Sequence, residues 1–359
     1  MSQTKVEAPF VANNFAHFKN LVINGDFRVF QRASGSTAIG NGTYSTADRY
    51  KTQFSNDGAG TTQQYTMTDA DRATTGHSFA WQWDVGTADG TIGSSQLAYF
   101  RHFIEAQNCS GLAYGSSAAK TLTLSFWVKS AKTGTYCCTI HKHDSTTYNL
   151  PIEYSISSAD TWEHKTLVIS PTAGSTSLIT GSGGDIAQDN GKGIIIDWWL
   201  ASGSDYTGGT NNTWSSNTNH LATTNQVNWL DSTSNNFYIT GIQLEVGSQA
   251  TPFEHEPISV TEQKCYRYYY KSTTYPLSLA NAQSTAYSFR QERTQQHSLP
   301  AIMRASPTFT AVQSIVSLAS GSVTLTGAND FVVVMSDAYG ADIPANNYWY
   351  GGYTAEAEL

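Results

Sequence analysis

Large apolar residues alternate with polar residues in several short segments of the chain, which is the pattern of strands that bury one face. The clearest segment is 122–128, where every second residue is large and apolar: Leu122, Leu124, Phe126 and Val128. Similar alternation, or a short continuous apolar run, predicts further strands at 79–85, 99–104, 162–169, 193–200 and 236–246. Glycines and Ser/Asn clusters separate these segments. The pattern therefore predicts an all-β chain.

The segment 236–254 predicts how the largest domain closes. Its alternation breaks at Gly241, which indicates a β-bulge, and it ends at a Gly-Ser turn followed by Pro252. A counterpart near the start, 20–27, predicts an opening strand. An opening and a closing strand about two hundred residues apart favour one large sandwich whose ends come together.

Four regions follow from this reading. We expect an N-terminal arm at 1–19, a jelly-roll β-sandwich at 20–257, a helical linker at 258–274 and a smaller C-terminal β-domain at 275–359. The arm either docks on a neighbouring subunit or another partner protein, or is a first strand or frayed end. The best helix candidate is 258–271, because it carries no helix breaker. The insertion 201–230 is long enough to be functional or disordered.

The C-terminal β-domain has its own predicted strands. They are 286–292, 298–303, 308–313, 322–326, 331–335 and 347–354. No repeat of twenty to fifty residues is visible in the sequence, which argues against solenoids and propellers.

Composition limits the function classes. Charged residues are only 13% of the chain, aromatics are 12%, and the formal net charge is −8. Neutral polar surfaces of this kind suit secreted and virion proteins, and the aromatic surplus suits a sugar-binding face. No Lys/Arg run, no long apolar run and no signal-peptide core are visible. We therefore expect no nucleic-acid binding, no membrane insertion and synthesis in the host cytoplasm.

Seven motifs, in order along the chain, carry a resemblance to a known family. They are NLVINGDF, TADRY, LTLSFWVKS, TWEHKTLVI, FYITGIQLEVGSQATPFEHEP, CYRYYYKS and the closing YTAEAEL. In these motifs the chain resembles bacteriophage tail-fibre or receptor-binding proteins with a carbohydrate-binding-module-like jelly roll. The resemblance covers roughly residues 20–271 and implies a virion protein, on the tail or on the capsid surface. It also implies a homotrimer.

Candidate glycan-binding residues gather in and around the long insertion. Trp214 stands among asparagines in a polar stretch, where it has no obvious core to join. An exposed indole could receive the apolar face of a sugar ring, while side-chain amides take its hydroxyls. We predict a carbohydrate-binding site made of Trp214, Tyr206, Asn212, His220 and Trp229. The alternative for Trp214 is a core or intersubunit residue, and core packing is favoured for Trp81, Trp83, Trp127 and Trp162.

Metal and cofactor sites have weaker signals. Asp26 resembles a calcium ligand of jelly-roll modules, but Arg28 stands where that motif carries a glutamate, so a solvated Asp26 is favoured. His141, His143 and Asp144 could hold zinc or nickel, yet no third ligand is marked by spacing, and a solvated hairpin is favoured. The four cysteines have no CxxC spacing and predict free, mostly buried thiols. We expect no cofactor and no metal.

Catalytic motifs are absent from the sequence. It contains no Gly-x-Ser-x-Gly, His-Glu-x-x-His or Walker pattern. A glycosidase needs two carboxylates at a set separation, and no motif selects a pair from Glu105, Glu153, Asp197 and Glu245. The sequence therefore favours a non-enzymatic phage virion protein: a short tail fibre or receptor-binding protein that recognises a bacterial surface glycan and contacts other virion proteins. The alternatives are a capsid decoration protein or head fibre, and a polysaccharide depolymerase.

Overall fold

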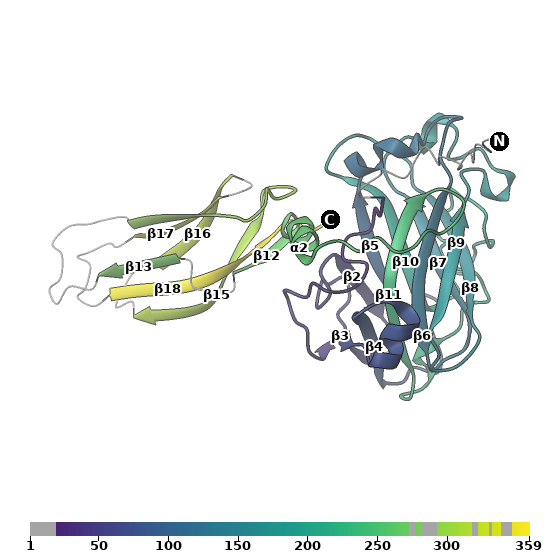
Figure 1. Ribbon diagram of the computed structural model, residues 1–359, viewed down its shortest axis with the longest axis horizontal. Coiled ribbons are helices and arrows are strands. Elements are labelled where there is room, and N and C mark those ends of the chain that lie inside the picture. Colours follow the sequence, from purple (N-terminus) through teal and green to yellow (C-terminus); the bar gives the residue numbers. More distant parts are fainter. Residues whose placement is uncertain (1–18, 273–276, 282–292, 318–321, 330–331, 339–346) are drawn as a thin grey trace, which may run out of the picture.

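The chain folds as an all-β protein, as the sequence predicts. A computed structural model describes residues 19–272, 277–281, 293–317, 322–329, 332–338 and 347–359. In Figure 1, strands β2 to β11 form a sandwich on the right, and the C-terminal strands extend to the left of α2. Neighbouring strands pair antiparallel throughout both sheets of the sandwich.

Two sheets make the sandwich. In order, the six-stranded sheet contains β1 (Thr37–Ala38), β3 (Ala59–Thr66), β4 (Phe79–Thr87), β11 (Asn236–Val246), β6 (Leu122–Ser130) and β9 (Glu163–Ile169). The five-stranded sheet contains β2 (Tyr50–Ser55), β5 (Leu97–Glu105), β10 (Lys192–Ser202), β7 (Gly134–Lys142) and β8 (Tyr148–Ile156). The predicted strands at 79–85, 99–104, 122–128, 162–169, 193–200 and 236–246 overlap β4, β5, β6, β9, β10 and β11.

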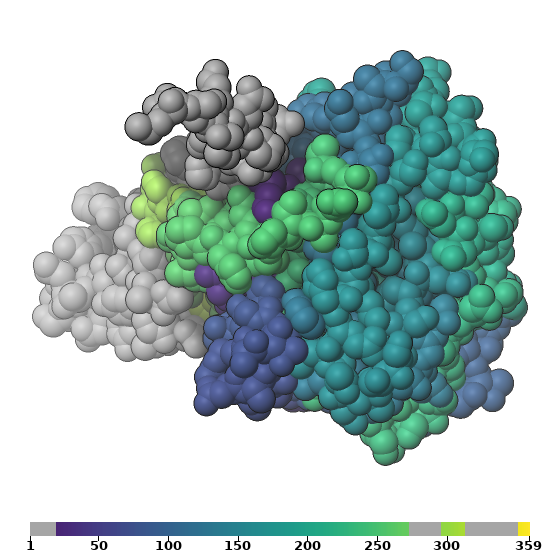
Figure 2. All heavy atoms as spheres, turned by 45° about the vertical axis from the view of Figure 1, so that its right-hand side comes forward, coloured from purple at the N-terminus to yellow at the C-terminus, as the bar shows by residue number. Residues whose placement is uncertain are grey.

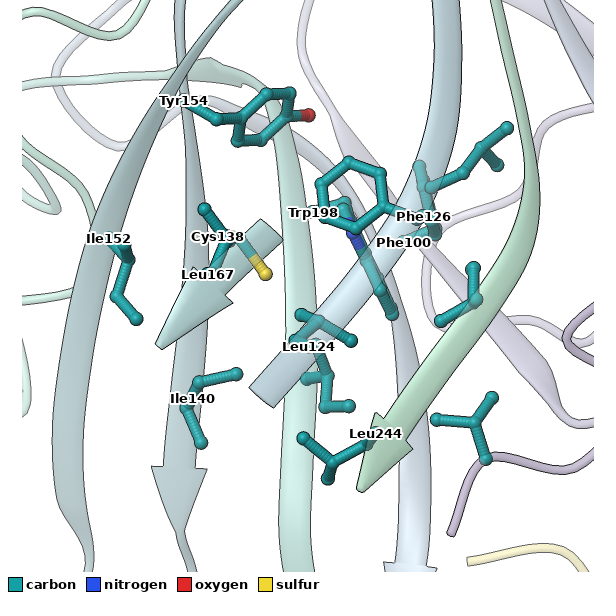
Figure 3. Packing of buried hydrophobic residues seen from close by; sticks show 14 of the residues in the cluster. Phe100, Leu124, Phe126, Cys138, Ile140, Ile152, Tyr154, Leu167, Trp198 and Leu244 are labelled. Atoms are coloured by element: carbon teal, nitrogen blue, oxygen red, sulfur yellow. The ribbon is translucent and has the colours of Figure 1, made fainter. Parts of the chain in front are cut away.

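Aromatic rings from both sheets fill the space between them. The Phe100 ring stacks on Trp198 with centroids 5.2 Å apart, and Phe126 of the opposite sheet meets Trp198 edge-on at 6.2 Å. Figure 3 shows these three rings beside the aliphatic side chains of the core. Trp81 and Trp83 are fully buried in the same cluster. Each such ring pair contributes roughly 0.5–1.5 kcal/mol beyond the burial of its area.

The opening segment reaches the closing strand as irregular backbone. The predicted strand at 20–27 is wrong, because this stretch forms turns. Its groups still pair with β11: the Leu21 amide donates to the Leu244 carbonyl at 2.9 Å, and the Ile242 amide donates to Gly25 at 2.9 Å. The register of β11 against β6 shifts at the predicted bulge. The bulge frees backbone groups that the opening segment then satisfies.

Several elements of the fold were not predicted from the sequence. The strand β3 carries Ala, Gly, Thr and Gln along most of its length, so no hydrophobic alternation marks it. The strands β2 and β8 and the helix α1 (Asp69–Thr75) were not predicted either. The helix α1 begins with a capping box in which Thr68 and Asp71 exchange side chain-to-backbone hydrogen bonds. The helix α2 spans Ile258–Tyr266, shorter than predicted, because β12 (Tyr269–Lys271) follows at once.

The long insertion lies over the outer face of the five-stranded sheet. Tyr206, Leu221 and Ala222 pack there against Trp199 and Tyr99. Both faces of β10 are therefore covered, and Trp198 and Trp199 are both fully buried, which confirms the prediction of a strand buried on both sides.

The C-terminal strands form two further sheets. One contains β12, β13 (Leu277–Asn281), β15 (Thr308–Ser317) and β18 (Asn347–Glu356), and the other contains β14 (Arg293–Ser298), β16 (Ser322–Asn329) and β17 (Val332–Ala338). The predicted strands at 308–313, 322–326, 331–335 and 347–354 overlap β15, β16, β17 and β18. The strand predicted at 298–303 is wrong, since β14 ends just before Pro300, which cannot continue a ladder. Residues 1–18 and the strand predicted at 286–292 lie outside the described residues.

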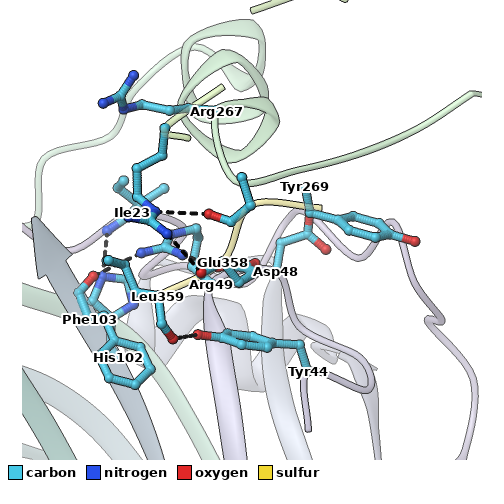
Figure 4. Close-up of polar contacts among 12 residues, drawn as sticks. Ile23, Tyr44, Asp48, Arg49, His102, Phe103, Arg267, Tyr269, Glu358 and Leu359 are labelled. Carbon is cyan, nitrogen blue, oxygen red and sulfur yellow. Dashed lines mark hydrogen bonds and ion pairs between the residues drawn. The ribbon is translucent and has the colours of Figure 1, made fainter. Parts of the chain in front are cut away.

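Buried charge joins the last residues of the chain to the sandwich (Figure 4). The Arg49 side chain is fully buried and forms an ion pair with Glu358. The Arg49 guanidinium also donates to the Phe103 carbonyl at 2.9 Å and lies 3.3 Å from the ring centroid of Tyr268. The Tyr44 hydroxyl donates to the Leu359 carbonyl at 2.9 Å. An arginine buried in this way requires its carboxylate partner.

Replacement of Glu358 should therefore destabilise the whole chain. We expect Glu358→Ala to lower the free energy of unfolding by about 3–5 kcal/mol, because it leaves the Arg49 charge buried without a carboxylate. Glu356→Ala is the matched control, since the Glu356 side chain is 48% exposed. Urea unfolding of both variants measures the difference. Equal stability of the two variants would contradict the role assigned to Arg49.

Candidate functional site

A row of polar and aromatic side chains covers the middle of the outer face of the six-stranded sheet. Because Leu124, Phe126 and Val128 point into the core, the residues between them on β6 face outward. Trp127 is one of these and is half-buried. It lies directly opposite His164 of β9, with ring centroids 5.1 Å apart.

The chain that follows β11 turns back over this outer face. Glu245 accepts hydrogen bonds from the Thr251 amide at 2.8 Å and the Thr251 hydroxyl at 2.7 Å. Gln243 accepts from the Glu254 amide at 2.8 Å. In Figure 2 this green segment crosses the surface of the sandwich beside the dark blue region of α1. The polar residues of the QLEVGSQATPFE motif thus hold the returning segment 250–255 on the sheet.

A cavity of about 530 Å³ lies between the returning segment, the sheet and the end of α1. Its lining comprises Thr75, His77, Ser125, Trp127, His164, Gly241, Ala250, Thr251, Pro252, Phe253 and His255. The rings of His77 and Phe253 meet edge-on at 4.7 Å, and His255 lies 5.3 Å from His77 and 5.0 Å from Phe253. We call this the outer-face cavity.

Three imidazoles are the only ionisable side chains in that lining. Burial lowers the pKa of His77 to about 4, and the nearby His255, His164 and Arg28 charges add to the effect. Partial burial of its ring against the sheet also lowers the pKa of His164. No hydrogen-bond partner of the His77 ring lies among the described residues, and its Nδ1 atom is buried. A neutral imidazole offers one donor and one acceptor, so the cavity can receive an uncharged ligand with hydroxyl groups.

Gly241 is required at the floor of the outer-face cavity. Its φ of +62° lies in the left-handed region, which a side chain disfavours. A Cβ atom at this position would lie 2.4 Å from Nε2 of His77. The bulge that ends the regular β11 ladder therefore also makes room for the His77 ring.

Two of the sequence-predicted site residues are buried. Trp214 is only 2% exposed and donates from Nε1 to the Ser170 carbonyl at 2.8 Å. Trp229 is fully buried and donates to Asn236 at 3.1 Å. The expectation that Trp214 lies on the surface is wrong, because the polar insertion folds back and presses its indole into the sandwich core. Neither indole can stack on a ligand in this arrangement.

The other three predicted site residues reach the surface. Tyr206 and His220 are half-buried and come from adjacent chain segments, and Asn212 is exposed. Tyr206 packs against Trp199 with centroids 6.0 Å apart, and Nδ1 of His220 lies 2.8 Å from the Ser215 hydroxyl. A ligand contact by Tyr206, Asn212 and His220 stays a prediction.

Side chains expected to be solvated are instead engaged within the fold. Asp26 is 6% exposed, forms an ion pair with Arg28 at 2.5 Å, and has its pKa raised by burial. His141 is buried, with Nε2 2.9 Å from Asp197 and Nδ1 2.7 Å from Asn149. Both expectations of solvation are therefore wrong, since neighbouring segments cover these residues. In the part of the chain that the structure describes, no group of three His, Cys, Asp or Glu side chains is placed to hold a metal ion.

The four cysteines are free and buried, as predicted. Trp81, Trp83 and Trp162 are buried as predicted, whereas Trp127 is only half-buried on the outer face. Within the described ranges, no helix is long and apolar enough to cross a membrane.

The strand carboxylates that a glycosidase might use all have partners. Glu105 receives two hydrogen bonds of 3.0 Å from Arg267. Asp197 receives bonds of 2.8 and 2.6 Å from Arg101. Glu153 accepts from Thr223 at 2.5 Å and from Asn225 at 3.0 Å, and Glu245 is bound to Thr251 as described above. Each carboxylate therefore contributes to the fold.

No family model and no curated protein matches this chain. Solved structures resemble it weakly. A protein from Bacteroides thetaiotaomicron VPI-5482, provisionally described as sugar-binding, is 12% identical over 64% of this chain and 100% of its own, with a TM-score of 0.34. The enzymatically active domain of bacteriophage CBA120 tailspike protein 4 is 14% identical over 64% of this chain and 22% of its own (TM-score 0.28). TmCBM61, solved in complex with β-1,4-galactotriose, is 10% identical over 64% of this chain and 99% of its own, with a TM-score of 0.29.

The buried imidazole of His77 should make the fold sensitive to acid. The folded chain keeps this imidazole neutral down to a pKa of about 4, whereas the unfolded chain takes up a proton near the ordinary value of 6.5. The contribution of the neutral His77 ring to the free energy of unfolding is therefore fully present above pH 6.5. It is lost as the pH falls toward 4, and the loss reaches about 2 kcal/mol at pH 5. When the pH is lowered from 7.5 to 5, we expect the free energy of unfolding to fall less for His77→Gln than for the unmodified chain. Urea unfolding at both pH values measures this, and identical pH dependence of the two proteins would contradict it.

Proposed function

We propose that this chain binds a saccharide of the bacterial surface through the outer-face cavity, as a non-enzymatic structural protein of a phage virion. One observation supports this choice of binding site. The Trp127 indole, the Phe253 ring and three imidazoles line one open cavity of about 530 Å³. This volume lies within the range of roughly 300–1,000 Å³ typical of small-ligand sites.

The chemistry of the lining fits a sugar. Trp127 and Phe253 are half-buried, so each offers part of an aromatic face to the C–H groups of a pyranose ring. His164 and His255 are exposed at the rim, and His77 lies deeper. Their ring nitrogens and the Thr251 hydroxyl can exchange hydrogen bonds with sugar hydroxyls. Since the lining contains no carboxylate and no ammonium group, a neutral sugar ring suits the cavity better than a charged one.

The virion role rests on the ordered motifs and on the composition. We propose a homotrimer on the phage tail, as a short fibre or receptor-binding protein in contact with other virion proteins. The low content of charged side chains favours such self-association. A capsid decoration protein or head fibre is the alternative location. The arm at 1–19 is proposed as the attachment segment.

We propose that the protein does not cleave the polysaccharide that it binds. Glu105 and Asp197 are fully buried and paired with arginines, so neither is poised as a general acid or nucleophile. The lining of the outer-face cavity offers no carboxylate pair. A depolymerase would require such a pair beside the bound sugar.

Removal of the Trp127 indole tests the binding site. We expect Trp127→Ala to weaken binding to host envelope oligosaccharides about ten- to hundredfold, by analogy with the roughly 1–3 kcal/mol that aromatic stacking on flat ligands contributes. Because Trp127 is half-buried on the outer face, the melting temperature should fall by only a few degrees. Glycan-array and calorimetric titrations of the purified oligomer measure the affinity.

Two further variants serve as controls in the same experiment. Trp214→Ala should lower stability by about 3–5 kcal/mol, since it empties a core position, while binding per folded molecule persists. Tyr206→Ala removes a half-buried aromatic from the long insertion. If Tyr206→Ala abolishes binding and Trp127→Ala does not, the sugar binds at the insertion and the outer-face proposal fails.

A further inference from the structure

Cationic side chains gather on the opposite side of the sandwich, on the outer face of the five-stranded sheet. Lys51 of β2 pairs across the ladder with Arg101 of β5. Lys192 begins β10, and Arg304 comes from the segment between β14 and β15. Burial lowers the pKa of Lys192, and the charges of Lys51, Arg101 and Arg304 lower it further. In a chain of net charge −8, four like charges have therefore been brought within electrostatic reach of one another.

Within the described ranges of the chain, one of these four cations has a carboxylate partner. Arg101 is paired with Asp197. Among the described residues, no carboxylate lies within ion-pair distance of Lys51 or Lys192; their ammonium groups lie 5.7 Å from the Tyr44 ring and 5.0 Å from the Phe103 ring.

Arg304 is held in place by backbone carbonyls. It donates to the carbonyls of Ala357 at 2.9 Å, Asn190 at 2.9 Å and Glu358 at 3.1 Å. These bonds fix the guanidinium without neutralising its charge. The position of Arg304 is therefore set before any ligand arrives.

Two neighbouring cavities open at this cluster. One, of about 440 Å³, is lined by His143, Lys192 and Arg304. The other, of about 540 Å³, is lined by Lys51, Tyr44 and Arg304. Arg304 and Leu359 line both, so the two cavities adjoin, and we call the pair the cationic cleft.

Four acidic side chains line the cleft, and all are already engaged: Glu358 forms an ion pair with Arg49, and Glu356 lies 3.5 Å from Arg32. Asp144 accepts from the Ser145 amide at 2.7 Å, and Asp189 accepts from the Gly191 amide at 2.8 Å. Neither is an ion-pair partner of Lys192 in the structure. Their hydrogen bonds hold them against their own loops.

We propose that the cationic cleft binds the anionic group, carboxylate or phosphate, of an acidic polysaccharide. An anion placed near Lys192 would relieve the repulsion among Lys51, Lys192 and Arg304 and gain attraction from all three. Nucleic acid fits less well, because a few cations on a chain of net charge −8 cannot follow a phosphate backbone. The site lies on a different sheet from the outer-face cavity and does not depend on it.

Charge reversal at Lys192 tests the cationic cleft. The full chain is titrated at low salt with polygalacturonate, with a poly(glycerol phosphate), with neutral dextran and with single-stranded DNA. We expect binding to at least one of the two acidic polysaccharides. Tighter binding of polygalacturonate would identify carboxylate as the anionic group that is recognised, and tighter binding of poly(glycerol phosphate) would identify phosphate. Lys192→Glu should weaken this binding at least tenfold and reduce its salt dependence.

Lys120→Glu is the matched control. Lys120 is exposed, and the substitution changes the net charge by the same amount. Lys51→Glu serves as the second variant if Lys192→Glu fails to fold. The proposal is overturned if neither acidic polysaccharide binds, if Lys120→Glu weakens binding as much as the cleft variants do, or if DNA binds more tightly than both polysaccharides. Trp127→Ala should leave binding to the acidic polysaccharides unchanged, which separates this site from the outer-face cavity.

Discussion

The left-handed backbone of Gly241 is the constraint on which both the closure of the sandwich and the outer-face cavity depend. The bulge shifts the register of β11 against β6 and turns the Ile242 amide toward the opening segment at Gly25. Asn20 then bonds the Ile242 carbonyl and the Leu244 amide at 3.0 Å each. The same glycine leaves the space in which the His77 ring lies. One backbone irregularity thus ties the two ends of the sandwich together and shapes the floor of the cavity.

The two outer faces of the sandwich are covered in different ways. The long insertion seals much of the five-stranded sheet with apolar contacts, so Trp199 is fully buried. The returning segment 250–255 is short and is held by the polar side chains of Gln243 and Glu245, so it covers the six-stranded sheet only in part. A cavity remains beside it, with Trp127 in its wall. Partial cover by a segment that is hydrogen-bonded to the sheet leaves this cavity open in the folded chain.

The sequence predicted several strands whose apolar residues alternate, because that alternation directly reflects burial on one face. The strand β8, in which Tyr148, Leu150 and Ile152 also alternate, was nevertheless missed. The sequence did not predict β3, whose Thr and Gln residues carry no such signal. Trp214 illustrates the main limit: its neighbours in sequence are polar, yet its neighbours in space are core residues, and only the path of the insertion decides between them. A signal for the outer-face cavity was present. In 122–128, Trp127 occupies the polar side of the alternation, where an aromatic residue is unexpected.

The central claim is that a saccharide enters the cavity between Trp127 and the returning segment. Its most direct test is a titration of the full chain, labelled with ¹⁵N and ¹³C at histidine, with oligosaccharides from the host envelope, followed by NMR. The account predicts that the ring signals of His77, His164 and His255 shift together with one affinity, while the buried His141 does not respond. Shifts at His220 without any at His77, His164 and His255 would place the ligand on the long insertion and contradict the account.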